Sequence, residues 1–403
     1  MNNKKSSVPK LRFPEFTDAW EQRKLGNVVD IIGGGTPDTS IPEYWEGDID
    51  WYSPTEIGEQ IYAKGSIKKI TELGLQKSSA KILPAKRTIL FTSRASIGDM
   101  AILAKSGTTN QGFQSFVLKG DSVDLYFLFS LGHQIKRFAL KHSTGSTFLE
   151  ISKTELGKMN LYLPKIQEQQ KIGSFFTALD RLITTHQRKL ENVKKLKKSL
   201  LQKMFPKNGQ EFPEIRFPEF TDAWEQRKLG KLADFNPRSN LPDEFKYVDL
   251  ESVVGTELTG YRFENKLSAP SRAQRLAQKG DIFYQTVRPY QKNNYLFEFE
   301  DENFVFSTGY AQLRPLINGR FLFSKLQEDR FVQQVLDKCT GTSYPAINSS
   351  DLSEIKVYIP DNKQEQQKIG SFFTALDRLI TTHQRKLENV KKLKKALLQQ
   401  MFV

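Results

Sequence analysis

The sequence predicts a mixed (α+β) protein in which two globular α/β domains are separated by two long helices, paired as an antiparallel coiled coil with pseudo-twofold symmetry. Two internal repeats and one heptad pattern carry this prediction. The letters RFPEFTDAWEQRKLG occur at 12–26 and return at 216–230. The 32 letters QEQQKIGSFFTALDRLITTHQRKLENVKKLKK occur at 167–198 and return at 364–395. A repeat of this kind dictates architecture, so the chain is predicted to be two tandem units.

Two variable regions lie between the constant blocks, at 27–166 and 231–363. They differ at most positions but share a faint skeleton. Each has a basic turn, a strand rich in β-branched and aromatic residues, and then an arginine, Arg94 or Arg288. Each region is therefore predicted to be one globular α/β domain of the same fold with its own surface.

The longer repeat carries apolar residues spaced alternately by four and three, which is the heptad pattern of a coiled coil. About 40 residues separate Pro164 from Pro206, or roughly 60 Å of helix. Neither helix can bury its stripe alone, so we expect an antiparallel pair with the globular domains at opposite ends of a rod. The predicted seam is Ile172, Phe176, Leu179, Ile183, Leu190 and Val193, with Ile369, Phe373, Leu376, Ile380, Leu387 and Val390.

His186 and His383 fall on the same seam. A partly buried ring whose polar tip is satisfied is the favoured interpretation, and a register device or a pH-sensitive contact is the alternative. The lysines at the helix ends are expected to be exposed, as a solvated face or as contacts to phosphates or an acidic partner. They are Lys194, Lys195, Lys197 and Lys198, with Lys391, Lys392, Lys394 and Lys395.

These elements define the predicted domain boundaries. The first globular domain is expected at 1–164 and its helix at 165–206, and the second domain at 207–360 and its helix at 361–403.

Composition narrows the class of protein. The chain has 60 basic and 46 acidic residues, a net charge of +14, which favours a polyanionic partner such as nucleic acid. No apolar run reaches the twenty or so residues of a membrane span, and the N-terminus lacks a secretory signal, so a cytoplasmic location is expected. A single cysteine, Cys339, excludes an internal disulfide, and no zinc-ligand spacing is present.

Two variable domains alternating with two nearly identical long helices, the first following a proline and beginning with EQQKI, resemble the specificity subunits of bacterial type I restriction-modification enzymes. The resemblance covers essentially the whole chain. It implies two target recognition domains, each reading one half of a bipartite, asymmetric DNA site. It also implies a non-catalytic protein whose helices set the gap and dock two methyltransferase subunits, which restriction subunits join for ATP-dependent cleavage.

The same resemblance implies that no cofactor belongs to this chain, because S-adenosylmethionine, ATP and Mg²⁺ belong to the partner subunits. Since the methyltransferases of the family modify adenine, each half-site is expected to contain an adenine.

Candidate DNA contacts are polar side chains on loops near strand ends, because arginine reads guanine and asparagine or glutamine reads adenine. Arg94 and Arg288 occupy matching places in the two regions, which suits a phosphate anchor. Gly33–Gly35 could cradle a phosphate, although a flexible turn is favoured. The full set is Ser93, Arg94, Ser96, Asn110, Gln111, Ser146 and Thr147 in the first domain, and Gln285, Arg288, Tyr290, Gln291, Lys292 and Tyr344 in the second.

Two rival functions remain open. Asp243, followed by Glu264 and Lys266, matches a loose spacing for a Mg²⁺-dependent nuclease, but such matches are common by chance and the first domain has no counterpart. A coiled-coil scaffold whose variable domains bind proteins is the second rival. No adenine-methyltransferase motif is present, so catalysis by this chain alone is not expected.

Overall fold

The computed structural model describes residues 8–58, 60–145, 149–207, 209–301, 303–341 and 343–403. The chain forms two compact units. Unit 1 comprises Met1–Thr185 with Lys386–Val403, and unit 2 comprises His186–Arg385. Each unit holds one α/β domain and a segment of each long helix, α6 (Ile166–Lys203) and α10 (Lys363–Gln400).

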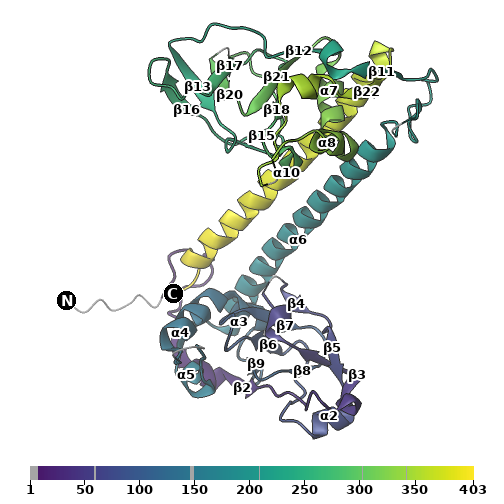
Figure 1. Ribbon diagram of the computed structural model, residues 1–403. Coiled ribbons are helices and arrows are strands. Elements are labelled where there is room, and N and C mark those ends of the chain that lie inside the picture. Colours follow the sequence, from purple (N-terminus) through teal and green to yellow (C-terminus); the bar gives the residue numbers. More distant parts are fainter. Residues whose placement is uncertain (1–7, 59, 146–148, 208, 302, 342) are drawn as a thin grey trace. The chain divides into compact units, whose positions relative to one another are not determined.

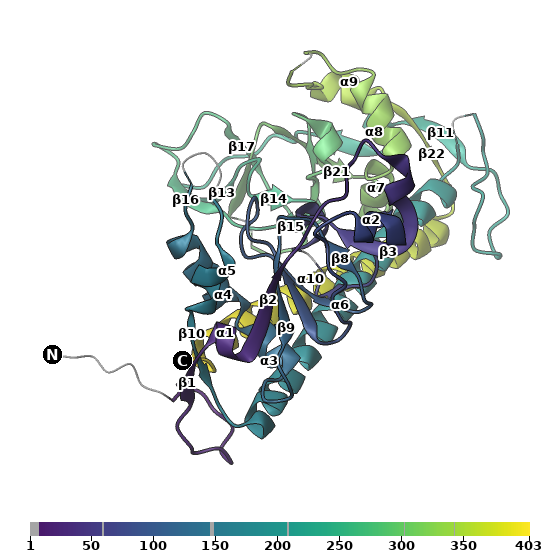
Figure 2. The ribbon, with the colours of Figure 1, turned by 90° about the horizontal axis from the view of Figure 1, so that it is seen from below.

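The α/β domain of unit 1 contains a sheet of strand order β2-β9-β6-β7-β4 and a second sheet of order β5-β3-β8, and β1 pairs antiparallel with β10. Figure 2 shows β2 and β9 side by side. The elements are β1 (Glu21–Lys24), α1 (Leu25–Val28), β2 (Val29–Gly33), β3 (Trp45–Tyr52), β4 (Tyr62–Ala63), β5 (Lys68–Ile70), α2 (Glu72–Gln76), β6 (Thr88–Phe91), β7 (Met100–Leu103), β8 (Thr108–Thr109), β9 (Gln114–Leu118), α3 (Leu125–Ser130), α4 (Gly132–His142), α5 (Lys153–Gly157) and β10 (Asn160–Leu163).

The α/β domain of unit 2 repeats this plan (Figure 1), with sheets of order β12-β21-β18-β19 and β16-β13-β20-β17, a β14-β15 hairpin, and β11 paired with β22. Its elements are β11 (Glu225–Lys228), β12 (Ala233–Phe235), β13 (Glu244–Val248), β14 (Val253–Val254), β15 (Glu257–Leu258), β16 (Arg262–Asn265), β17 (Ala273–Leu276), β18 (Ile282–Gln285), β19 (Tyr295–Leu296), β20 (Phe304–Ser307), β21 (Tyr310–Pro315), α7 (Gly319–Leu326), α8 (Asp329–Leu336), α9 (Ser349–Ser353) and β22 (Lys356–Ile359).

The two long helices run antiparallel within each unit, as the heptad pattern predicts. In unit 1 the ring of Phe176 on α6 packs against Phe402, just beyond α10, and Asp180 further along α6 pairs with Lys394, earlier on α10. In unit 2 Phe205 packs against Phe373. His186 and His383 meet there, with their Nδ1 atoms 3.3 Å apart and both rings partly buried, which agrees with the favoured interpretation.

Each helix fits into a socket in its own α/β domain through the EQQKIG sequence at its start. In unit 1 the Gln169 side chain accepts a hydrogen bond from the Asp124 backbone N–H at 3.0 Å and donates to the Pro164 carbonyl at 2.8 Å. In unit 2 Gln366 makes the same contacts with Asn318 and Pro360, at 3.1 and 2.8 Å. The repeated glutamine thus joins the helix to the helix that follows the sheet.

A glycine one turn further on lets the helix backbone come close to the same place. A Cβ at Gly173 would lie 2.4 Å from Oδ1 of Asp124, and one at Gly370 would lie 2.6 Å from the backbone nitrogen of Phe321. Asp124 and Asn318 are the N-caps of α3 and α7. The close approach therefore requires glycine in both units.

The repeated 15-residue block forms a clip across the first turn of each long helix. The Arg12 guanidinium donates two hydrogen bonds of 2.7 Å to the buried Glu168 carboxylate, which also accepts from the Trp20 indole at 3.3 Å. Arg216 and Glu365 repeat the bidentate pair at 2.8 and 2.9 Å. A bidentate arginine supplies the compensation that a buried carboxylate needs.

An aromatic cluster completes the core at each socket. In unit 1 Phe402 packs against Trp20, Phe127 and Phe176. The corresponding residue of unit 2, Phe205, packs against Trp224, Phe321 and Phe373. No helix among the described residues is both long enough and apolar enough to span a membrane.

Candidate nucleic-acid interface

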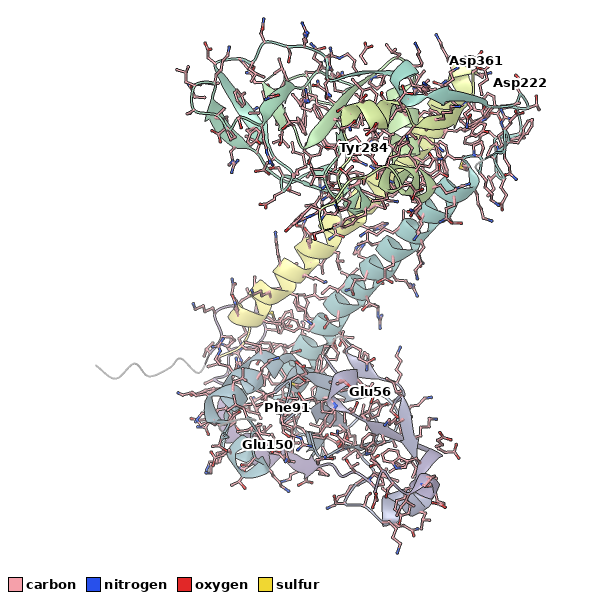
Figure 3. All side chains as sticks on the ribbon, in the orientation of Figure 1. Glu56, Phe91, Glu150, Asp222, Tyr284 and Asp361 are labelled. Carbon is pink, nitrogen blue, oxygen red and sulfur yellow. The ribbon has the colours of Figure 1, made fainter. Side chains whose placement is uncertain are left out.

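The candidate interface of unit 1 begins where β6 ends. Ser93 is buried, and its backbone is fixed on both sides, because its N–H donates to Gly112 at 2.8 Å and its carbonyl accepts from Ile151 at 3.0 Å. Arg94 follows and bridges to Glu150, which is labelled in Figure 3. The turn then continues through the exposed Ser96. The strand end therefore presents Arg94 and Ser96, and keeps the Ser93 side chain inside.

Asn110 and Gln111 lie on the loop after β8, next to this turn. The Asn110 side chain accepts from the Gly112 backbone at 2.8 Å, and a Cβ at Gly112 would lie 3.0 Å from its Oδ1 and 3.5 Å from Nε of Arg94. Gln111 is exposed and accepts a hydrogen bond from the Thr36 hydroxyl. Arg94, from the turn after β6, and Asn110, from the loop after β8, thus lie close together. Ser146 and Thr147 lie outside the described residues.

The triple glycine of unit 1 packs against this loop. A Cβ at Gly34 would lie 2.0 Å from the Asn110 carbonyl oxygen, and the Gly35 N–H donates to the Thr109 carbonyl at 2.9 Å. Glycine is required at Gly34 and Gly35 by this close backbone approach, whereas a Cβ at Gly33 would make only ordinary contacts. Gly34 and Gly35 are therefore packed against the chain rather than forming the flexible turn that the sequence favoured.

In unit 2 the corresponding strand end presents Arg288 with two tyrosines. The Arg288 guanidinium lies 4.4 Å from the ring centroid of Tyr344. Tyr344 is 62% exposed and Tyr290 is 51% exposed. A half-buried cation stacked on an exposed aromatic ring, with a second exposed ring two residues away, is a surface suited to bases and phosphates.

The other candidates of unit 2 make contacts within the domain. Gln285 is 2% exposed, donates to Gln291 at 2.8 Å and accepts from the Asn293 backbone at 3.1 Å. Lys292 donates to the Gln327 carbonyl at 2.9 Å and pairs with Asp329. Roles for Gln285, Gln291 and Lys292 at DNA stay predictions, and their contacts show that they also brace the loop that carries Tyr290.

The structural alignment of the two domains corrects the match between the arginines. Thr144 and Arg94 both bridge to Glu150 in unit 1, whereas Thr340 and Val287 both bridge to Ala346 in unit 2. These bridges align Arg94 with Val287. The next residues are Ala95 and Arg288, and both have left-handed backbones with φ of 60° and 55°. The expected match of Arg94 with Arg288 is therefore wrong by one residue, and each arginine is specific to its own domain.

The residues of the nuclease pattern are adjacent but poorly suited to a metal. The Lys266 N–H donates to the Asp243 carbonyl at 2.8 Å, so the pattern does meet at the β13–β16 edge. Glu264, however, lies 3.7 Å from Arg262. Within the described ranges no group of three or more histidine, cysteine, aspartate or glutamate side chains is placed to hold a metal ion.

The clip and the socket are features that the sequence reasoning did not assign. Arg12 and Glu168 each recur, as Arg216 and Glu365, in two different repeated blocks. The ion pair could have been predicted from the sequence, because an arginine in one repeated block and a glutamate in the other recur together. Part of the identity between the long helices is thereby explained by how each holds its own domain.

Comparison with known proteins identifies the family. The model of the type I restriction modification DNA specificity domain matches residues 17–195 and 222–392. The chain belongs to this family, carries two such domains, and is a specificity subunit of a type I restriction-modification system, as the resemblance predicted.

Individual relatives agree with this assignment. The chain is 29% identical to the type I restriction enzyme MjaIX specificity subunit of Methanocaldococcus jannaschii, over 94% of this chain and 91% of that protein. It is 32% identical to the EcoR124I/EcoR124II specificity subunit of Escherichia coli over 43% of each. The fold matches the crystal structure of the type I S subunit from M. genitalium with a TM-score of 0.67 at 17% identity, covering 98% of this chain and 99% of that one.

Proposed function

We propose that each α/β domain reads one half of a bipartite, asymmetric site in duplex DNA, and that the helix pair sets the gap between the two halves. One observation carries the proposal: the domains share a backbone plan but differ in sequence at the strand end. When the two domains are aligned there, Arg94 corresponds to Val287 and Ala95 corresponds to Arg288. A shared frame with different exposed side chains is what two readers of different sequences need.

The helices supply a surface that suits docking of two methyltransferase subunits. With the predicted seam as positions a and d, the leucines at 182, 196, 379 and 393 all take position g, next to the seam. Leu182 and Leu393 belong to unit 1, and Leu196 and Leu379 belong to unit 2. Each is about half exposed. The same apolar pair therefore occurs once in each unit, which favours two copies of one partner.

The subunit composition follows the family. Restriction subunits would join the two methyltransferase subunits for ATP-dependent translocation and cleavage, and S-adenosylmethionine, ATP and Mg²⁺ would be bound by those partners. This chain would supply no catalytic group and no cofactor site. One solved relative with a TM-score of 0.53 comes from work on complex assembly and conformational transition of the type I system, which supports looking for such an assembly.

The deciding experiment maps methylation. The chain is combined with its methyltransferase subunit and S-adenosylmethionine, and N6-methyladenine is located by sequencing across a random DNA library. We expect a two-part motif with a fixed unspecified gap. An intact complex with an active methyltransferase but no motif would favour the protein-binding scaffold instead.

The proposed docking surface is tested by placing a charged residue at its exposed leucines. Leu182→Glu with Leu393→Glu should remove one of two methyltransferase copies, read by native mass spectrometry as a change in stoichiometry. Leu140→Glu, on α4 and equally exposed, is the matched control and should leave both copies bound. Retention of both copies by the double variant would move the docking site elsewhere.

A further inference from the structure

Arg288 holds a backbone conformation that arginine rarely adopts. Its φ is 55° in the left-handed region, where a side chain with a Cβ is disfavoured and glycine is the usual choice. Residues kept in such conformations concentrate at functional sites. The aligned residue of unit 1 is Ala95, with φ of 60°. The turn therefore accepts a small side chain, and the arginine is an addition specific to the second domain.

The surroundings fix where the Arg288 side chain goes. Its N–H donates to the Pro345 carbonyl at 2.8 Å, and its carbonyl accepts from Gln291 at 3.0 Å, so its backbone is held on both sides. Its guanidinium lies over the ring of Tyr344. No ion pair to a carboxylate is found for Arg288 within the part of the chain that the structure describes. Stacking uses the face of the guanidinium and leaves the N–H groups of its edge for a ligand.

The arrangement discriminates between the two acceptors that DNA offers. A phosphate anchor positions the protein without reading sequence, and it is expected at the same place in both domains. Arg288 has no arginine counterpart in the first domain. A planar fork of donors held by an aromatic ring matches the paired O6 and N7 acceptors of guanine in the major groove. Ala95 could make no such contact.

We propose that Arg288, oriented by Tyr344, reads a guanine in the half-site of the second domain and is a specificity-determining residue of this protein. The inference rests on the proposed bipartite recognition. Tyr344 is a positioning residue that acts through the guanidinium, and its ring rather than its hydroxyl performs this role.

The test uses the complete complex with the methyltransferase subunit and compares methylation motifs on the random library. Arg288→Ala should make one G·C position of the second half-site degenerate and lower methylation at the original site by about 5- to 150-fold. The first half-site and the gap should stay unchanged. Tyr344→Phe should keep the motif, and Tyr344→Ala should weaken discrimination at that same position.

Arg288→Lys separates a base reader from a phosphate anchor, because lysine keeps the charge but loses the planar fork. We expect the lysine variant to be degenerate at the same base pair. An unchanged motif with uniformly weaker methylation in Arg288→Ala, restored by lysine, would overturn the inference in favour of a phosphate contact. A wild-type second half-site that lacks a G·C pair would overturn it too.

The outcomes also separate this inference from the function on which it rests. A wild-type complex without any two-part motif defeats the proposed function. A clear wild-type motif that Arg288→Ala leaves intact defeats only the assignment of Arg288. Co-purification with the methyltransferase subunit and an unchanged melting temperature show that each variant is folded.

Discussion

The Lys394 ammonium lies 2.6 Å from Oδ1 of Asp180 within unit 1, and the Tyr126 hydroxyl donates to the same carboxylate at 2.7 Å. Lys197 and Asp377 form the equivalent pair in unit 2. The two lysines continue the apolar seam at position a of the heptad. The exposed fraction of the side chain is only 14% for Lys197 and 23% for Lys394. The expectation that all the terminal lysines are solvent-exposed is therefore wrong for these two.

Loss of either lysine should destabilise its own unit. Lys394→Ala and Lys197→Ala each leave a partly buried carboxylate without its cation, at a cost of about 1–3 kcal/mol in the free energy of unfolding. Chemical denaturation monitored by circular dichroism measures this cost. Lys194→Ala and Lys391→Ala remove exposed lysines from the same helices and should change stability little. Equal effects of all four substitutions would contradict a special role for the pairs.

The cost of losing Lys197 should also depend on pH. Burial raises the pKa of Asp377, and Lys197 opposes that rise. A carboxyl whose pKa is raised on folding stabilises the folded state most below its ordinary pKa, and this contribution is lost as pH rises through the folded value. Without Lys197 the loss is larger, so Lys197→Ala should be more destabilising at pH 7 than near pH 4. A difference from wild type that does not change with pH would contradict this.

The socket glycines should not tolerate a methyl group. Gly173→Ala and Gly370→Ala place a Cβ against the N-cap region of the next helix, and we expect a loss of about 1–3 kcal/mol despite the better helix propensity of alanine. Thermal unfolding of each variant is the measurement. Gly157→Ala is the matched control, because its Cβ would meet its neighbours at 3.8 Å or more. A stabilised Gly173→Ala would show that the helix stands further from Asp124.

The clips should loosen in acid. A hydrogen bond from Lys171 lowers the pKa of Glu15, and one from Lys165 lowers the pKa of Asp18. A carboxyl with a lowered pKa stabilises the folded state above its ordinary pKa, and that contribution is lost as pH falls through the lowered value. Hydrogen exchange at 12–26, corrected for intrinsic rates, should therefore increase below about pH 4. Lys171→Met should already show part of this increase at pH 7, and equal protection at both pH values would contradict the prediction.

Helix length should set the gap in the DNA site. Deleting 187–193 together with 384–390 removes one heptad from each helix and shifts both lysine–aspartate pairs by the same seven residues, so both can reform. About 10.5 Å of helix is lost, which corresponds to roughly three base pairs. The methylation motif should keep both half-sites and shorten its gap. Deleting four residues from each helix breaks the heptad phase and should abolish assembly. An unchanged gap after the heptad deletion would contradict the prediction that helix length sets the gap.

The helix pair could be predicted because the seam residues, such as Phe176 and Phe373, recur at the heptad spacing of four and three residues. Periodicity could not place Lys197 or Lys394, since a pattern of apolar letters does not show that a lysine has an aspartate opposite it on another helix. Arg94 and Arg288 were mismatched because strand-end turns that differ in sequence must be aligned by backbone bridges. Gln285 looked like a loop residue, but it ends β18 and points inward.

The socket has a genetic consequence. The residues that repeat, from the clip arginines Arg12 and Arg216 to the helix glycines Gly173 and Gly370, lie in blocks of identical sequence. The domains that pack against the two glycines, however, differ in sequence. A crossover within the longer block between this gene and a second gene that carries the same block would therefore join a foreign domain to a helix that already fits it. The gene can exchange one reader for another in a single recombination event, without any compensating change in the protein that holds it.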